Sequence, residues 1–280
     1  MIRFFTDMAE NQFLATGLAA GLLASLACGV IGPYVVTRRI VFLSGAIAHM
    51  AVGGIGTALF LAAQFPRSFG WLQPIGGATV AALLGAVLIG FIHERVTERM
   101  DTLIGALWAV GMAVGVLLIK FTPGYQAELM SYLFGNIVYV SPRDIHVMVA
   151  LDVVIVVTVL IWHKRLLAIC LDRQQAELQG INVLAVNIVL LCLVALTVIC
   201  LTQVVGLILV IALLSLPAAT AAHHVARMGP MIAVSTVLCA LITTLPRIAV
   251  YGTRISPEAA IVLAAGGVYL CSVAVRRALG

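Results

Sequence analysis

Three residues set one helical turn apart, Gly45, His49 and Gly53, form the pattern in this sequence that is best suited to chemistry. Residues at i, i+4 and i+8 share one face of a helix, so the imidazole projects from a face that otherwise has no side chains. Such a face either touches a neighbouring backbone or borders a cavity. Imidazole is a preferred ligand of zinc, copper, nickel and iron, so a cavity with His49 on its wall would suit a transition metal ion. A histidine hydrogen-bonded between two helices is the other interpretation.

A few other ionisable residues lie in or beside apolar runs. Asp152 sits inside one, where it either pairs with a polar group of a neighbouring helix or forms a step in a cation path. His223 and His224 lie at the end of another, where a solvated interfacial position is the ordinary role and contact with a departing ion is the alternative. An ionisable group at membrane depth is costly unless it faces protein or water, so each is a functional candidate.

The elements that must position these side chains are long apolar helices. Apolar residues make up 63% of the 280 residues and charged residues only 10%, and the mean hydropathy is +1.17. Runs of about twenty apolar residues match the ~30 Å hydrocarbon core of a bilayer. The sequence therefore predicts an all-α, polytopic membrane protein with one domain over residues 1–280. We expect nine spans, at residues 13–36, 41–63, 71–92, 102–120, 144–162, 183–203, 205–222, 230–250 and 258–275. Eight is the alternative count, because the two runs on either side of Gln203 nearly touch and must form a tight hairpin there.

The distribution of charged residues and cysteines excludes several classes of function. The charges lie in short connections and form no basic face, so we expect no nucleic-acid partner. The six cysteines show no C-x-x-C spacing, which favours packing over a disulfide framework or a zinc cluster. The sequence has no G-x-x-x-x-G-K-[ST] phosphate loop, so we expect no ATP hydrolysis, no catalytic residue and no bound cofactor on this chain.

The 16 Lys and Arg residues predict the orientation in the membrane. Most of them fall in loops on one side, which the positive-inside rule assigns to the cytoplasm. With nine spans, the N-terminus then lies outside an inner (cell) membrane and the C-terminus inside.

The longest polar stretch, residues 163–182, falls on the predicted cytoplasmic side. Leu167, Leu171, Ala176 and Leu178 give it an apolar stripe, whereas polar residues such as Asp172 keep the rest solvated. The pattern predicts a short helix lying along the membrane surface. It is either a connector or a knob that inserts into a groove of a soluble partner and transmits force to the bundle.

Five blocks in order give the chain a resemblance to a known family, the permease subunits of ABC importers for zinc, manganese and related metal ions. The blocks cover residues 35–56, 100–119, 128–145, 172–181 and 204–222. The resemblance extends over nearly the entire chain, and five ordered blocks are far more specific than a single motif.

This resemblance implies a permease like those of type II ABC importers, with a divalent metal ion as its substrate. It also implies a permease homodimer, a cytoplasmic ATP-binding subunit that holds the ATP, and an extracytoplasmic metal-binding protein that delivers the ion. Ala176 and Gly180 resemble the A-x-x-x-G part of the loop that engages the ATPase. Asp172 and Leu178 belong to the same coupling segment.

One position departs from the family pattern. The family commonly has an acidic residue one turn before the membrane histidine, in a G-D-x-L-x-H pattern, whereas this chain has Ser44 and Gly45 before His49. Loss of the carboxylate removes an anionic oxygen ligand and weakens the coordination of hard ions such as manganese. We therefore favour zinc, with manganese or iron as alternatives.

The sequence thus predicts a permease that passes a divalent metal ion inward by alternating access. His49 is the metal ligand, and Ser44, Gly45, Gly53 and Asp152 border the path. The competing hypotheses are a gradient-driven secondary transporter or channel that needs no ATPase, and a membrane scaffold subunit. The scarcity of carboxylates within the membrane argues against gradient coupling.

Overall fold

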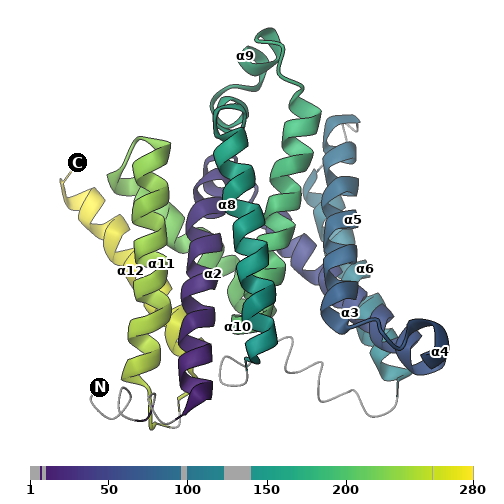
Figure 1. Ribbon diagram of the computed structural model, residues 1–280. Coiled ribbons are helices and arrows are strands. Elements are labelled where there is room, and N and C mark those ends of the chain that lie inside the picture. Colours follow the sequence, from purple (N-terminus) through teal and green to yellow (C-terminus); the bar gives the residue numbers. More distant parts are fainter. Residues whose placement is uncertain (1–6, 8–10, 96–99, 123–139, 254, 280) are drawn as a thin grey trace.

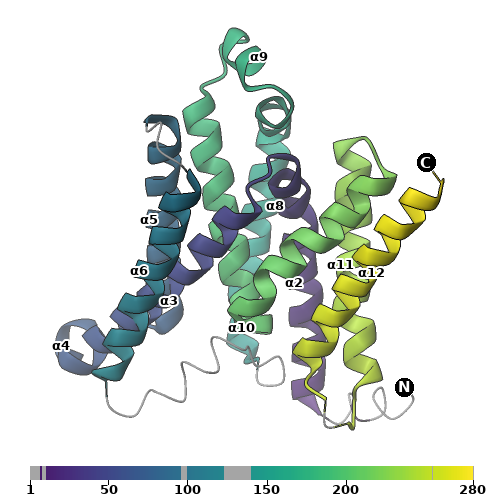
Figure 2. The ribbon, with the colours of Figure 1, turned by 180° about the vertical axis from the view of Figure 1, so that it is seen from behind.

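The computed structural model describes residues 7, 11–95, 100–122, 140–253 and 255–279, and these form a bundle of helices without any β-strand (Figures 1 and 2). The all-α prediction is confirmed. The helices are α2 (Gln12–Thr37), α3 (Val41–Gln64), α4 (Pro66–Phe69), α5 (Pro74–Arg95), α6 (Met100–Lys120), α8 (Pro142–Leu171), α9 (Arg173–Leu178), α10 (Val183–His224), α11 (Met228–Ala249) and α12 (Pro257–Leu279).

Within the described residues, eight helices are long and apolar enough to cross a membrane, which confirms the alternative count and corrects the expected nine. The difference arises in α10. Its first part, Val183–Thr202, is a full span, whereas its second part, Leu209–His224, has fewer than 18 residues. At 1.5 Å per residue such a helix is shorter than the ~30 Å hydrocarbon core.

The sharp turn expected near Gln203 occurs at Gly206. This residue has φ 72° and ψ 167°, a conformation that side-chain-bearing residues rarely adopt, and it interrupts α10. The chain reverses there, and the second part of α10 rises obliquely toward α11 (Figure 2). The two apolar runs therefore remain separate helical segments.

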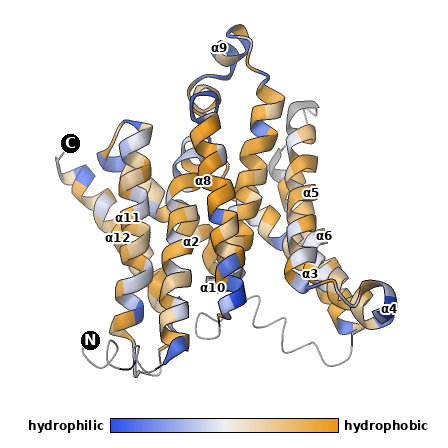
Figure 3. Cartoon of the chain, viewed as in Figure 1, coloured by the Kyte–Doolittle hydropathy of each residue, from blue (hydrophilic) through white to orange (hydrophobic). Residues whose placement is uncertain are grey.

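Hydrophobic residues run along most of the length of the long helices (Figure 3), and many of them are exposed. On α8, for example, Leu160 and Ile161 are exposed while Ile155 and Leu166 are buried. Helices that are apolar all round are typical of membrane spans, because lipid and protein core are equally suitable surroundings for such side chains. The chain is an integral membrane protein.

Two sets of helices build the core. α3 packs between α5 and α6, while α2 packs against α8, α10 and α11, and α10 contacts both sets. The approach of α3 to α6 depends on small residues, since a Cβ atom on Gly53 would lie 2.8 Å from the carbonyl oxygen of Gly111. Close backbone approach of this kind is how helices associate in lipid.

The start of α2 and the end of α12 lie at opposite ends of the bundle, and α9 lies at the end where α12 finishes (Figure 1). The predicted orientation places that end in the cytoplasm, and it stays a prediction.

Candidate metal path and coupling segment

His49 lies at the interface of α3 and α6, where it contacts two side chains of α6. Its ring stacks on the indole of Trp108, with centroids 4.4 Å apart and an angle of 22° between the planes. Its Nδ1 lies 3.0 Å from the sulfur of Met112, and because a thioether only accepts, the imidazole N–H is the donor. The polar partner of the histidine is therefore a soft sulfur atom.

The glycine-lined face of α3 touches a neighbouring helix. A Cβ atom on Gly45 would lie 2.7 Å from Cζ3 of Trp108 and 2.9 Å from Cδ1 of Ile211. The absence of a side chain at position 45 is therefore what leaves room for the indole beside His49. The sequence left open whether this face touches a neighbouring helix or borders a cavity. At Gly45 it touches its neighbours.

Gly53, two turns further along the same face of α3, lies at the edge of a groove as well as in contact with α6. It lines an apolar groove of about 430 Å³ between α3, α5 and α6, together with Met50, Thr57 and Gly111. Ser44, in contrast, is buried and its hydroxyl donates to the carbonyl of Val41 over 2.6 Å. The hydroxyl proton of Ser44 is therefore used within its own helix.

Asp152 lies on α8 in the other half of the bundle, where it is only 3% exposed. Its Oδ1 is 3.9 Å from the thiol of Cys200 on α10, and its Oδ2 has no hydrogen-bond partner. Cys200 is itself buried. The contacts of Asp152 have no residue in common with those of His49, so the structure does not bring these two predicted path residues together.

The predicted coupling segment consists of two helices, which differs from the single surface helix expected over 163–182. α8 continues as far as Leu171, and the six-residue α9 follows after Asp172. Apolar residues keep α8 regular to its end, and the Asp172 carboxylate then begins a new helix by accepting from the backbone N–H groups of Gln174 (2.8 Å) and Gln175 (3.2 Å).

A glycine ends α9. Gly180 has φ +76°, its N–H donates to the carbonyl of Glu177, and the N–H of Ile181 donates to the carbonyl of Ala176. This pair of bonds is the Schellman motif, which requires the left-handed conformation that glycine adopts readily. Both ends of α9 are therefore fixed by local hydrogen bonds.

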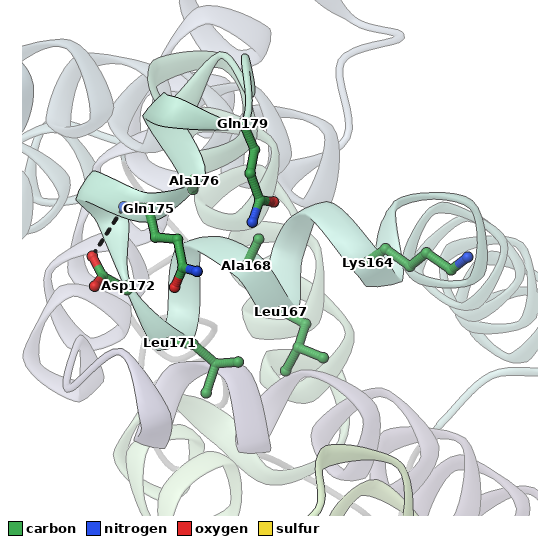
Figure 4. Close-up of a pocket in the computed structure, with 8 residues that line it drawn as sticks. All are labelled: Lys164, Leu167, Ala168, Leu171, Asp172, Gln175, Ala176 and Gln179. Carbon is green, nitrogen blue, oxygen red and sulfur yellow. Dashed lines mark hydrogen bonds between the residues drawn. The ribbon is translucent and has the colours of Figure 1, made fainter.

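The two apolar side chains of α9 have opposite environments. Ala176 is 1% exposed and anchors the helix to the bundle, whereas Leu178 is 89% exposed at the tip of the molecule. Between α8 and α9 lies a pocket of about 340 Å³, shown in Figure 4, whose lining residues are Lys164, Leu167, Ala168, Leu171, Asp172, Gln175, Ala176 and Gln179. A protruding leucine beside an amphipathic pocket is suited to contact with a soluble partner.

His223 and His224, the predicted exit residues, are the last two residues of α10 and converge on one hydroxyl of α12. Nδ1 of His223 is 2.9 Å and Nε2 of His224 is 3.0 Å from Oγ of Ser272. In the part of the chain that the structure describes, no three His, Cys, Asp or Glu side chains lie close enough to hold a metal ion together.

Sequence reasoning missed three residues that contact the predicted ones: Trp108, Met112 and Ser272. Trp108 and Met112 are one turn apart on α6, and only the position of α6 against α3 shows that they face His49. Most of the family-like block at 128–145 lies outside the described residues.

Comparisons with known proteins bear on the family and the fold of this chain. The profile of the ABC 3 transport family matches residues 10–276. The chain is 36% identical over 264 residues to a Chlamydia trachomatis protein named "Probable metal transport system membrane protein", which covers 94% of this chain and 89% of that one. It is 29% identical over 218 residues to the manganese transport system membrane protein MntC of Halalkalibacterium halodurans, over 78% of this chain and 72% of that one.

A solved structure shares the fold. PsaBC from Streptococcus pneumoniae, determined in complex with Fab, superimposes with a TM-score of 0.86 at 27% identity and covers 97% of this chain and 95% of that chain.

Proposed function

Because this chain belongs to the ABC 3 transport family and is a membrane permease of the metal-transport type, we propose that it moves zinc into the cell by alternating access, driven by ATP hydrolysis on a separate cytoplasmic subunit. An extracytoplasmic metal-binding protein delivers the ion, and two copies of the permease pair in the inner membrane.

The observation that carries the choice of metal is the contact between His49 and Met112. An imidazole and a thioether are soft or borderline ligands that suit zinc and similar ions, whereas manganese prefers carboxylate and carbonyl oxygens. Gly45 supplies no carboxylate, and Ser44 turns its hydroxyl to its own backbone. The relative named for manganese is only 29% identical, which leaves room for a different ion.

Passage of the ion requires a weak and temporary site, because an ion held tightly is not released. His49 offers one nitrogen: with the imidazole proton on Nε2, Nδ1 would bind the ion and the Met112 sulfur beside it would be a second, weaker ligand. Gly53 and the groove beside it allow α3 and α6 to move against each other without side-chain obstruction. Asp152, whose second carboxylate oxygen is unpartnered, is a further cation contact on the α8 side.

The coupling segment from Asp172 to Gly180 receives the movement of the ATPase. Its tip presents Leu178 to a partner, while Asp172 and Gly180 fix the two ends of α9 and Ala176 anchors it. A helix held in this way transmits force as a rigid body. The 280 residues contain no phosphate loop, which supports an ATPase on a separate polypeptide.

Uptake into proteoliposomes tests the proposal. With the ATPase and ATP present, the wild-type permease should take up zinc in preference to manganese, and the permease alone under an ion gradient should take up neither. Uptake without ATP would favour the gradient-driven alternative.

Two variants test the metal site. We expect His49→Ala to abolish zinc uptake while the complex still assembles. Met112→Leu conserves volume, so it should leave folding nearly unchanged and reduce the preference for zinc over manganese. The matched control is His146→Gln, since His146 is exposed and contacts only its own helix. Wild-type zinc uptake by the His49→Ala variant would remove the ligand role.

A further inference from the structure

A second pair of imidazoles, outside the site at His49, converges on a single oxygen atom. His223 and His224 end α10, and Ser272 lies on α12, buried to 7% exposure. Nδ1 of His223 and Nε2 of His224 lie 2.9 Å and 3.0 Å from the Ser272 hydroxyl, so the two nitrogens are less than about 6 Å apart. Neighbouring residues on one helix rarely aim at the same atom.

The ring of His223 is held in place by its neighbours. It packs at 5.5 Å from the ring of Tyr269 on α12, and the two imidazoles meet edge to face at 6.4 Å. The orientation of the first nitrogen toward the hydroxyl is therefore supported by packing as well as by a hydrogen bond. His224 is exposed, so the cluster is open to solvent at the end of the bundle where α9 lies.

A serine hydroxyl has one proton, so it donates to one imidazole and accepts from the N–H of the other, and these hydrogen bonds satisfy the three atoms while no ion is bound. The same three atoms also converge closely enough to hold an ion. Metal–imidazole bonds are about 2.0–2.1 Å in a tetrahedral site, so neighbouring ligand atoms on one ion lie roughly 3.4 Å apart, slightly more than the present nitrogen–oxygen distances.

We propose that His223, His224 and Ser272 form a second metal site, on the end of the bundle that carries α9, for an imidazole-preferring ion such as zinc or cobalt, with water completing the coordination. This site goes beyond the proposed transport function, because its binding can be measured without transport. With the predicted orientation, the site would meet ions at the cytoplasmic face, as an exit or sensing site.

A nearby positive charge makes the site weak. Arg276, one turn after Ser272 on α12, is exposed and close enough to interact electrostatically with His223. A guanidinium repels a dication across water-exposed space, although solvent screens much of the effect. The same charge would favour an anion such as phosphate. Removing the charge therefore separates the two kinds of ligand.

Cobalt(II) binding tests the proposal. The full chain, in lipid nanodiscs and in a His49→Ala background that removes the first site, is titrated with cobalt(II) and followed by calorimetry and by visible absorption. We expect one equivalent with nitrogen-ligand absorption bands. His223→Asn with His224→Asn should remove this equivalent, and His146→Gln, the control on an exposed histidine, should not.

Single variants keep the test decisive if the double variant folds poorly. His224→Asn changes an exposed side chain and should weaken cobalt binding at least tenfold, whereas Ser272→Ala should weaken it less. Arg276→Gln should tighten cobalt binding severalfold.

The same cobalt stoichiometry with and without the two histidines would overturn the proposal. Weaker cobalt binding in Arg276→Gln, or phosphate binding that depends on Arg276, would also overturn it. Because position 49 is alanine throughout, failure here is distinct from failure of the transport proposal.

Discussion

The guanidinium of Arg38 donates a 2.8 Å hydrogen bond to the carbonyl oxygen of Ile169. Arg38 ends α2, three residues before α3 begins, and Ile169 lies in the last turn of α8, three residues before the cap of α9. The Ile169 carbonyl belongs to the last turn of a helix, where carbonyls have no partner within the helix, and the arginine supplies one. The connection between α2 and α3, just before the helix that carries His49, is thus joined to the last turn of α8, just before the predicted coupling helix α9.

A second bond extends this link to the other side of α9. Arg38 also contacts Oδ1 of Asn187 on α10, at 3.4 Å. One turn earlier on α2, the hydroxyl of Tyr34 lies 2.6 Å from Nδ1 of His163 on α8. The two helices that flank α9 are therefore both tied to the end of α2, so movement of α9 would be passed toward α3.

Replacing Arg38 with glutamine should weaken this connection. Hydrogen bonds from a charged donor contribute about 1.5–3 kcal/mol, so we expect a loss of stability in that range and a larger loss of metal uptake than of ATPase activity in the reconstituted complex. Arg39→Gln is the control, because Arg39 is the exposed neighbour. Equal loss of uptake and ATPase activity would indicate a merely structural role for Arg38.

Gly180 should tolerate only residues that accept its backbone conformation. No atom lies within 4 Å of a Cβ built at this position, so the constraint is the φ of +76° and not space. We expect Gly180→Val to cost about 1–2 kcal/mol locally and to lower transport-coupled ATPase activity, whereas Gly180→Asn should retain most of it, because asparagine adopts the left-handed region more easily. Equal activity of the two variants would contradict a conformational role.

Gly53 should be intolerant of a methyl group, in contrast to Gly105, an exposed glycine of α6. A Cβ at position 53 would lie 2.8 Å from a backbone oxygen of α6, which cannot move without separating the helices, whereas a Cβ on Gly105 meets nothing within 4 Å. Gly53→Ala should destabilise the bundle by about 1–3 kcal/mol, and Gly105→Ala should be neutral or slightly stabilising. Thermal unfolding in nanodiscs measures both.

Hydropathy was sufficient to locate the spans, because the bilayer leaves a long helix as the only arrangement for an isolated apolar run of this length. It failed at the second part of α10, which was expected to be a full span over 205–222, because the turn at Gly206 leaves a helix of fewer than 18 residues, Leu209–His224. It also failed for the segment before Asp172, where α8 continues past its polar residues His163 and Lys164.

The chemistry of the candidate site was predictable only in part. His49 was identified because an ionisable group in an apolar run is costly, and this argument needs no partner. Met112 and Ser272 carry no such signal, since a methionine or a serine in a span is unremarkable until a neighbouring helix places it beside an imidazole.

The indole of Trp108 occupies the space that a side chain at position 45 would need. This contact predicts which substitutions would change the metal preference. An aspartate at position 45 would restore a hard oxygen ligand one turn before His49, but its Cβ would lie 2.7 Å from the ring of Trp108. Gly45→Asp alone should therefore destabilise the protein and lower uptake of every metal. The double variant with Trp108→Ala, which removes the obstructing ring, should recover uptake and shift the preference toward manganese, because a carboxylate favours the harder ion.

The matched control is Trp108→Ala alone, which should lower uptake without changing the ratio of manganese to zinc. If the double variant transported with the wild-type ratio, position 45 would not contact the ion.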